Sequence, residues 1–192
     1  MMNYVEKKEG NIFCIPLFLP NIITKPNKSY TRNKFDPSKK YAFGRIVECD
    51  PHDESLYIVE IFQYIGKIPD NKEIIINSKL ICDPIFVIEP FIIKRWRFIF
   101  EDKNYDKYKD SDYSNIKFFA VPYEEPLLWK GGKDIGYLSV KESQSLGSIR
   151  FFTPGDVEEV LRDIIEGKQV SFYLEFTEHN LQGSGKPLKI HM

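Results

Sequence analysis

The chain has 192 residues, and its 27 Lys and Arg residues nearly balance its 28 Asp and Glu residues, which gives a formal net charge of -1. This length favours one domain, expected over residues 1–192. Its 42% hydrophobic content excludes a disordered chain, and its near-neutral charge argues against a protein that mainly coats nucleic acid. Since no apolar run approaches the roughly 20 residues that cross a bilayer, no membrane association is expected.

Cysteine usage and the first residues of the chain indicate a compartment. Cys14, Cys49 and Cys82 are odd in number and far apart, whereas secreted disulfide frameworks usually have even sets at close spacing. Residues 1–10 contain no apolar segment typical of a signal peptide. We therefore expect a cytoplasmic protein.

Short apolar runs closed by turn residues predict strands through the first half of the chain. The predicted strands cover residues 12–17, 41–49, 56–64, 73–80, 85–88 and 92–100. In the last of these, Arg95 and Arg97 alternate with aromatic residues and predict a basic, half-exposed face, while Trp96 is assigned to the core. Residues 19–40 are predicted to be irregular, with six basic residues between Lys25 and Lys40 that suit either a solvated loop or contact with an acidic partner.

The second half contains the clearest helix signal. Residues 101–115 and 122–133 are predicted to be irregular, on either side of a strand over 116–121. Thr153 is a natural N-cap, Pro154 suits the first helical position, Asp156 can answer the cap, and Gly167 ends the apolar stripe. A half-buried strand is predicted over 170–176. The fold class is therefore α+β, predominantly antiparallel β, with an SH3-like or barrel-like N-terminal sheet and one well-formed helix near the C-terminus.

The usual motifs of catalysis and metal binding are incomplete. Gly183-Ser184-Gly185-Lys186 lacks the upstream glycine, the following Ser or Thr and the helix of a phosphate-binding loop. The three histidines have no metal-ligand spacing, and the turn that separates Cys49 from His52 does not ensure the geometry of a catalytic pair. We expect no catalytic residue, no metal site and no cofactor.

Three segments of the N-terminal half form a recognisable series: Gly10-Asn11-Ile12-Phe13 leading to Pro16-Leu17, Tyr41-Ala42-Phe43-Gly44-Arg45, and the strand that closes on Ile61-Phe62. In this order they resemble the family-26 immunity proteins of bacterial polymorphic toxin systems. Trp96-Arg97-Phe98-Ile99 is similar to a later tryptophan-containing strand of the family. The resemblance covers roughly residues 9–100. It implies a non-enzymatic antidote that binds a protein toxin and occludes it.

If the toxin is a nuclease, the phosphate-binding cleft is basic and an acidic surface would complement it. The candidate contact residues on the predicted helix are Glu158, Glu159, Asp163 and Glu166, although acidic residues near a helix start are also favoured by the helix dipole. Trp129 is the candidate aromatic anchor, because tryptophan is enriched in binding hot spots.

An SH3-like nucleic-acid-binding module is the alternative. In it Arg45, Arg95 and Arg97 would contact phosphates while aromatic side chains stack on bases. The near-neutral net charge makes a nucleic-acid partner unlikely.

Overall fold

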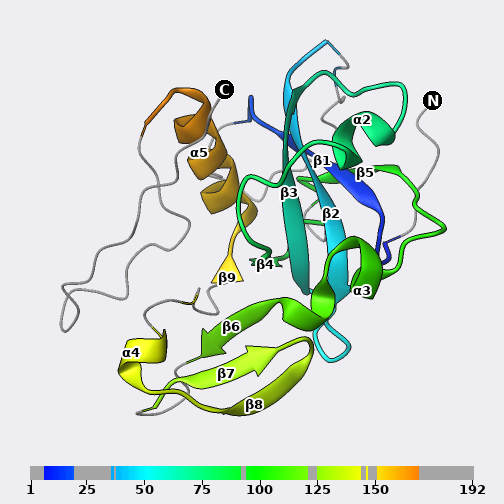
Figure 1. Cartoon of the computed structure of the whole chain (residues 1–192). Helices are drawn as coiled ribbons and strands as arrows, with labels where there is room; N and C mark the ends of the chain where they lie inside the picture. The colour runs from blue at the N-terminus through cyan, green and yellow to red at the C-terminus, as the bar shows by residue number, and fades with distance from the viewer. Residues whose placement is uncertain are drawn as a thin grey trace.

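Two β-sheets and five short helical segments form the described part of the protein, as a computed structural model shows (Figure 1). The structure describes residues 7–19, 36, 38–91, 94–120, 125–143, 146 and 151–168. The strand predicted over 170–176 and most of the basic segment from Lys25 to Lys40 lie outside these residues. The expected α+β class is confirmed.

The main sheet has six strands in the order β5-β1-β2-β3-β4-β9. Its strands are β1 (Ile12–Pro16), β2 (Tyr41–Cys49), β3 (Leu56–Gly66), β4 (Ile85–Ile88), β5 (Arg97–Phe100) and β9 (Phe151–Phe152). All neighbours are antiparallel except the parallel pair β4 and β9. Since β5 and β9 form two separate edges, this sheet is open, and the expected barrel-like closure does not occur in the described residues.

Side chains alternate between two buried faces along the central strands, as the continuous apolar runs predict. On one face, Phe13 and its neighbours pack against Val157 and Leu161 of helix α5 (Pro154–Ile165). On the other, Ile12 and its neighbours pack against Ile75 of helix α2 (Glu73–Ile76). The sheet is thus covered on both sides, which explains why β1 carries no polar side chain.

The N-cap of α5 follows the predicted pattern. The hydroxyl of Thr153 accepts a hydrogen bond from the Asp156 backbone N–H at 3.3 Å, and the Asp156 carboxylate accepts one from the Thr153 backbone N–H at 2.8 Å. Pro154 occupies the first helical position, and Gly167 follows with a φ of 72°. The predicted helix is confirmed.

A small sheet of three antiparallel strands lies beside the main sheet, in the order β6-β7-β8 (Figure 1). Its strands are β6 (Lys117–Ala120), β7 (Leu127–Lys130) and β8 (Lys133–Tyr137). Phe118 and Trp129 face the main sheet, where their rings contact Phe86 of β4. Gly131 and Gly132, with φ values of 54° and 87°, form the tight turn between β7 and β8.

Three sequence predictions are wrong in this part of the fold. Residues 73–80 contain the one-turn helix α2, where the Asn71 side chain accepts a hydrogen bond from the Glu73 backbone N–H at 2.7 Å. Residues 122–133, expected to be irregular, include β7, so Trp129 lies on a strand.

The expected loop over 101–115 contains α3 (Lys107–Asp110) and the 3-10 turn Tyr113–Asn115. Helix α4 (Val140–Ser143), β8 and β9 were not predicted.

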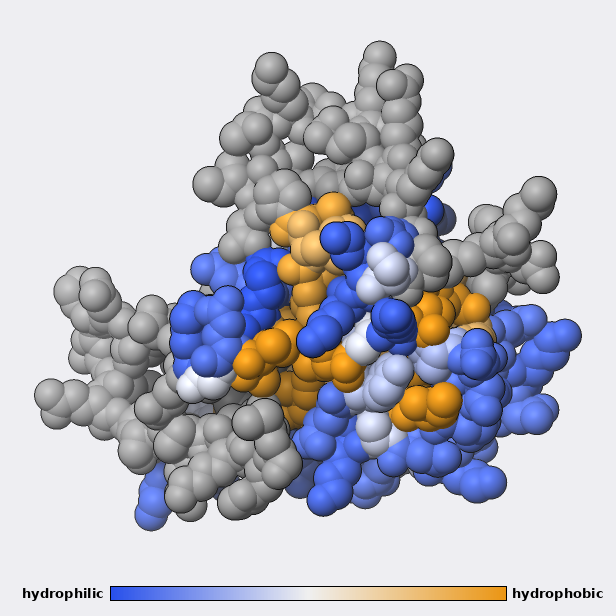
Figure 2. All heavy atoms as spheres, turned by 90° about the horizontal axis from the view of Figure 1, so that it is seen from above, coloured by the Kyte–Doolittle hydropathy of each residue, from blue (hydrophilic) through white to orange (hydrophobic). Residues whose placement is uncertain are grey.

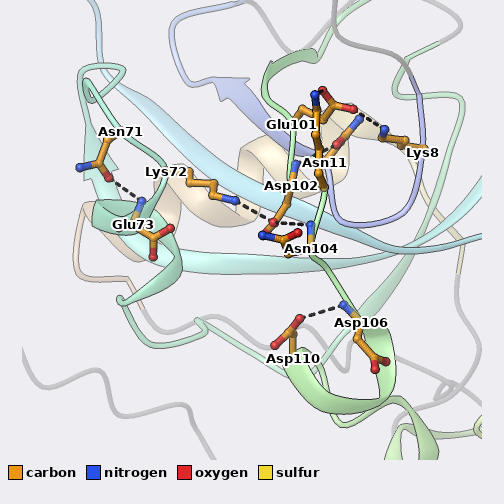
Figure 3. A network of polar contacts seen from close by, with 11 residues as sticks. Lys8, Asn11, Asn71, Lys72, Glu73, Glu101, Asp102, Asn104, Asp106 and Asp110 are labelled. Atoms are coloured by element: carbon orange, nitrogen blue, oxygen red, sulfur yellow. Dashed lines mark hydrogen bonds and ion pairs between the residues drawn. The ribbon is translucent and has the colours of Figure 1, made fainter.

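A polar network holds the segment after β5 against the body of the fold (Figure 3). The carboxylate of Asp102 accepts hydrogen bonds from Lys72 Nζ at 2.7 Å and from the Asn104 backbone N–H at 3.3 Å. The Asp102 backbone N–H donates to the side-chain oxygen of buried Asn11 at 3.2 Å. Next to it, Glu101 pairs with Lys8. These contacts fix the chain that leads into α3.

Three lysines are directly opposed on neighbouring strands of the small sheet, and they allow a stability prediction. Lys130 stands opposite Lys117 on β6 and opposite Lys133 on β8, and directly opposed like charges destabilise a sheet. No ion pair within the described residues includes them. Lys130→Glu is therefore expected to raise the free energy of unfolding by about 0.5–1 kcal/mol in urea titration. Lys67→Glu, the same charge change at an exposed position after β3, serves as control, and equal effects would contradict the prediction.

Candidate functional site

The first predicted contact residue, Glu158, lies in the core instead of on the surface of α5. Its two carboxylate oxygens accept hydrogen bonds from Nε and Nη2 of Arg95, both at 2.6 Å, and one accepts a third from Trp96 Nε1 at 3.1 Å. Burial raises the pKa of Glu158, and the hydrogen bonds from Arg95 and Trp96 oppose this rise. Glu158 is fully buried, so this placement removes it from the predicted contact surface.

The other three predicted acidic residues are placed unequally on α5 and its C-terminal end. Glu159 and Glu166 are exposed, and Asp163 is half-buried. Lys168 pairs with Asp163 at 2.7 Å and with Glu166 at 2.9 Å. Glu159 is thus the only exposed member of the set without an ion pair in the described part of the chain.

The three arginines of the nucleic-acid alternative are not available together for phosphate binding. Arg95 is buried against Glu158. Arg45 is also buried, and its Nε and Nη2 donate to Glu60 at 3.0 and 2.7 Å. Arg97 is half-buried on β5, where burial lowers its pKa. Two of the three arginines are therefore neutralised by buried ion pairs within the protein, which weakens the hypothesis of a nucleic-acid-binding module. As expected, Trp96 is buried in the core.

Trp129, the predicted aromatic anchor, is half-buried and lines a hollow between the two sheets. This Trp129 hollow has a volume of about 240 Å³. Its apolar wall includes Leu56, Ile58, Phe86 and Trp129. Its polar members are Glu48, Asp50 and His52, which come from the end of β2 and the turn toward β3. No lysine or arginine lines it.

A set of hydrogen bonds holds Glu48 in position at this hollow. Tyr113 Oη donates to Glu48 Oε2 at 2.5 Å, and Lys107 Nζ donates to Glu48 Oε1 at 2.9 Å. Lys107 also pairs with Glu9 at 3.2 Å. Although burial lowers the pKa of Lys107, its hydrogen bonds and charge interactions with Glu48 and Glu9 raise it overall. Lys107 therefore pairs with two carboxylates at once, and Lys7 lies nearby, with its Nζ 5.3 Å from the ring centroid of Tyr57 in the wall of the hollow.

The turn between β2 and β3 places Asp50 beside Glu48. Asp50 Oδ1 accepts hydrogen bonds from the backbone N–H groups of His52 and Asp53 at 2.8 and 2.9 Å. Sequence reasoning identified this turn but not Glu48 or Asp50 as site residues. The acidic composition of residues 50–54 was a signal, but nothing in the sequence indicates that Trp129 lies next to it.

A second, larger hollow of about 440 Å³ lies at another part of the junction between the sheets. Its polar lining includes Glu60, Asp83, Asp112 and Lys117, so both signs of charge are present. Glu60 is occupied by Arg45. This hollow has a less uniform charge than the Trp129 hollow and contains none of the predicted contact residues.

The face seen from above the view of Figure 1 displays apolar residues among hydrophilic ones (Figure 2). Ile74 of α2 and Ile165 of α5 are each 48% exposed. No described contact indicates what chemistry would cover them. The Trp129 hollow, which combines an aromatic wall with one sign of charge, is therefore the better defined candidate.

The thiol of Cys49 is expected to react slowly in the folded protein. Burial raises its pKa to about 11, so only about one molecule in a thousand carries the thiolate at pH 8. Labelling by Ellman's reagent at pH 8 should therefore be at least about 100-fold slower in native protein than in urea. The variant Cys14→Ser/Cys82→Ser isolates Cys49, and fast native labelling of it would contradict the prediction.

Within 7–168, outside the gaps given above, no group of three or more His, Cys, Asp or Glu side chains could hold a metal ion. No helix of that part is long and apolar enough to cross a membrane.

The described residues thus form an α+β fold, with an open, mostly antiparallel main sheet, buried internal ion pairs and a hollow lined by Trp129 and carboxylates. The sequence model of the family Immunity protein 26 matches residues 8–125, more than half of the 192 residues, and the chain belongs to this family. The match spans β1 to β6, while Trp129 and α5 follow it. No curated protein and no solved structure matches the chain.

Proposed function

We propose that this protein is a bacterial cytoplasmic immunity protein that binds a protein toxin and neutralises it by covering it. Membership of the Immunity protein 26 family carries this proposal. The chain acts by binding and catalyses no reaction. The toxin of a polymorphic system is the partner, and a nuclease with a basic cleft is the class that an acidic surface would suit.

The distribution of charge supports binding through a restricted surface. Arg45 and Arg95 are each ion-paired with one buried carboxylate, so their charges stabilise the interior and do not face a partner. Glu48, Asp50 and Glu159 remain at the hollow and on the exposed face of α5. These carboxylates, of which Glu48 is already paired with Lys107 at 2.9 Å, are among those that can complement a basic partner.

Co-expression with a candidate toxin, sought first among the genes beside this one, tests the proposal. We expect restored growth and a stable complex of the two purified proteins. An occluding inhibitor should abolish toxin activity at about one equivalent, since each molecule covers one toxin molecule. Complete inactivation by a small fraction of an equivalent would instead indicate catalysis, and loss of toxin activity without any complex would contradict occlusion.

A further inference from the structure

We propose that the Trp129 hollow receives an arginine side chain of the toxin. This inference rests on the proposed function and names the chemistry of the contact. The guanidinium would lie against the indole of Trp129 and be paired by the carboxylates of Glu48 and Asp50. Trp129 and the two carboxylates are far apart in the sequence and come together only in the folded chain, where β7 lies next to the turn after β2.

The size of the hollow fits one side chain. Its volume of about 240 Å³ is below the range of ~300–1,000 Å³ that is typical of pockets for small molecules and cofactors. Leu56, Ile58 and Phe86 form an apolar wall that can contact the methylene stem of a long side chain. An arginine provides such a stem with a planar charged end.

The charge of the lining selects a cation. Glu48 and Asp50 line the hollow together with His52, whereas no lysine or arginine does. Backbone N–H groups of the turn hold Asp50 Oδ1, and Tyr113 and Lys107 hold Glu48. Since both carboxylates are already oriented, a bound guanidinium would not have to order them.

The aromatic contacts of Trp129 keep the indole in a fixed orientation. Its ring centroid lies 5.5 Å from that of Phe118, 6.0 Å from Tyr113 and 6.1 Å from Phe86. Cations are attracted to an aromatic face within about 6 Å, most strongly to tryptophan. Arginine stacks on such a face and pairs with carboxylates at the same time, which lysine does less well.

Asp50→Asn is the variant that tests this site. Asparagine keeps a side-chain oxygen for the two turn hydrogen bonds and removes only the charge. Asp53→Asn is the matched control, because Asp53 lies in the same turn, accepts a hydrogen bond from the Ser55 backbone N–H at 2.8 Å and does not line the hollow. Binding is measured with the toxin identified by co-expression.

We expect Asp50→Asn to raise the Kd for the toxin at least about 10-fold, while Asp53→Asn changes it less than about twofold. Tryptophan quenching by acrylamide gives a second readout, since the chain has two tryptophans and Trp96 is only 1% exposed. Quenching of Trp129 should fall when the toxin binds.

Unchanged affinity of Asp50→Asn, or unchanged quenching of Trp129 in the complex, would overturn the inference while leaving the proposed function intact. Equal losses in Asp50→Asn and Asp53→Asn would also overturn it, since the effect would not belong to the hollow. If the wild-type protein neither binds the toxin nor restores growth, that result contradicts the proposed function and, with it, this inference.

Discussion

Replacing Arg95 with methionine is expected to lower the free energy of unfolding by about 3–5 kcal/mol, the usual cost of leaving one member of a buried ion pair without its partner. Arg95 and Glu158 are both fully buried in side chain. Methionine preserves much of the packing of the arginine stem but cannot donate to the carboxylate. The hydrogen bond from Trp96 Nε1, at 3.1 Å, remains but does not neutralise the charge, and Nη1 of Arg162, 3.8 Å from Glu158 Oε2, is then the nearest cation and too distant for the hydrogen bonds that Arg95 makes.

Chemical denaturation of three variants would measure this effect. Arg95→Met/Glu158→Leu should recover most of the lost stability, because removal of both buried charges is often nearly neutral. Lys168→Met, which removes the exposed partner of Asp163 and Glu166, should have almost no effect. If Arg95→Met were as harmless as Lys168→Met, the buried pair would not be needed for the stability of the fold.

The free energy of unfolding of Arg95→Met should depend on pH in a characteristic way. Burial raises the pKa of Glu158 above its ordinary value of 4.5, and loss of Arg95 removes the main opposing interaction. The folded variant therefore binds a proton more tightly than the unfolded one, so the destabilisation is complete above the folded pKa and fades as the pH falls toward 4.5. Unfolding measured between neutral and mildly acidic pH would follow this change.

The Arg95–Glu158 pair also illustrates the limit of sequence reasoning for this fold. The capping residues and the spacing of Val157 and Leu161 are local, so α5 was predicted correctly. Glu158 was assigned to the exposed face because charged residues are rarely fully buried. Its partner is 63 residues away in the sequence, and no local pattern indicates that pairing.

The apolar runs in the sequence predicted some strands correctly and one wrongly, because a short run alone does not distinguish a buried strand from a helical turn. β1, β2 and β3 are mostly apolar segments that lie in the middle of the main sheet and are buried along most of their length, as their composition predicts. The run at 73–80 is also apolar, yet Ile75 is buried while Ile74 is 48% exposed, because one helical turn directs only part of it inward. The β7–β8 hairpin carried a usable signal, since Gly131-Gly132 is a typical two-residue turn between strands.

The candidate site could be predicted only in part. An acidic surface with an aromatic anchor was expected, and Trp129 does lie beside carboxylates. The carboxylates beside Trp129 are those of Glu48 and Asp50, whereas the predicted acidic contact residues belong to α5 and the residue that follows it. Long-range packing of Phe86 against Trp129 brings them together, and this contact depends on the tertiary fold.

Gly44→Ala is expected to destabilise the protein by about 3 kcal/mol or more, the upper range for forcing extra volume into a packed core. An added Cβ would lie 2.4 Å from the ring of Phe13 and 2.6 Å from the carbonyl oxygen of Glu60. Phe13 cannot easily retreat, because its ring stacks on Trp96 at 5.2 Å. Gly44 belongs to the family-like segment that also contains Arg45, so close packing against β1 gives that segment a structural role.

Thermal unfolding provides the measurement, with Gly66→Ala as the matched control at the end of β3. There an added Cβ would first meet the Tyr64 hydroxyl at 3.1 Å, the far end of a side chain that can move. For a chain of this size we expect the midpoint to fall by about 6–12 °C in Gly44→Ala and by no more than about 3 °C in Gly66→Ala. Since Gly44 lies inside the sheet and away from the Trp129 hollow, the folded fraction of Gly44→Ala should still bind toxin with unchanged Kd at low temperature. A midpoint equal to that of Gly66→Ala would show that β1 and β2 can separate enough to admit a methyl group, contrary to the packing described here.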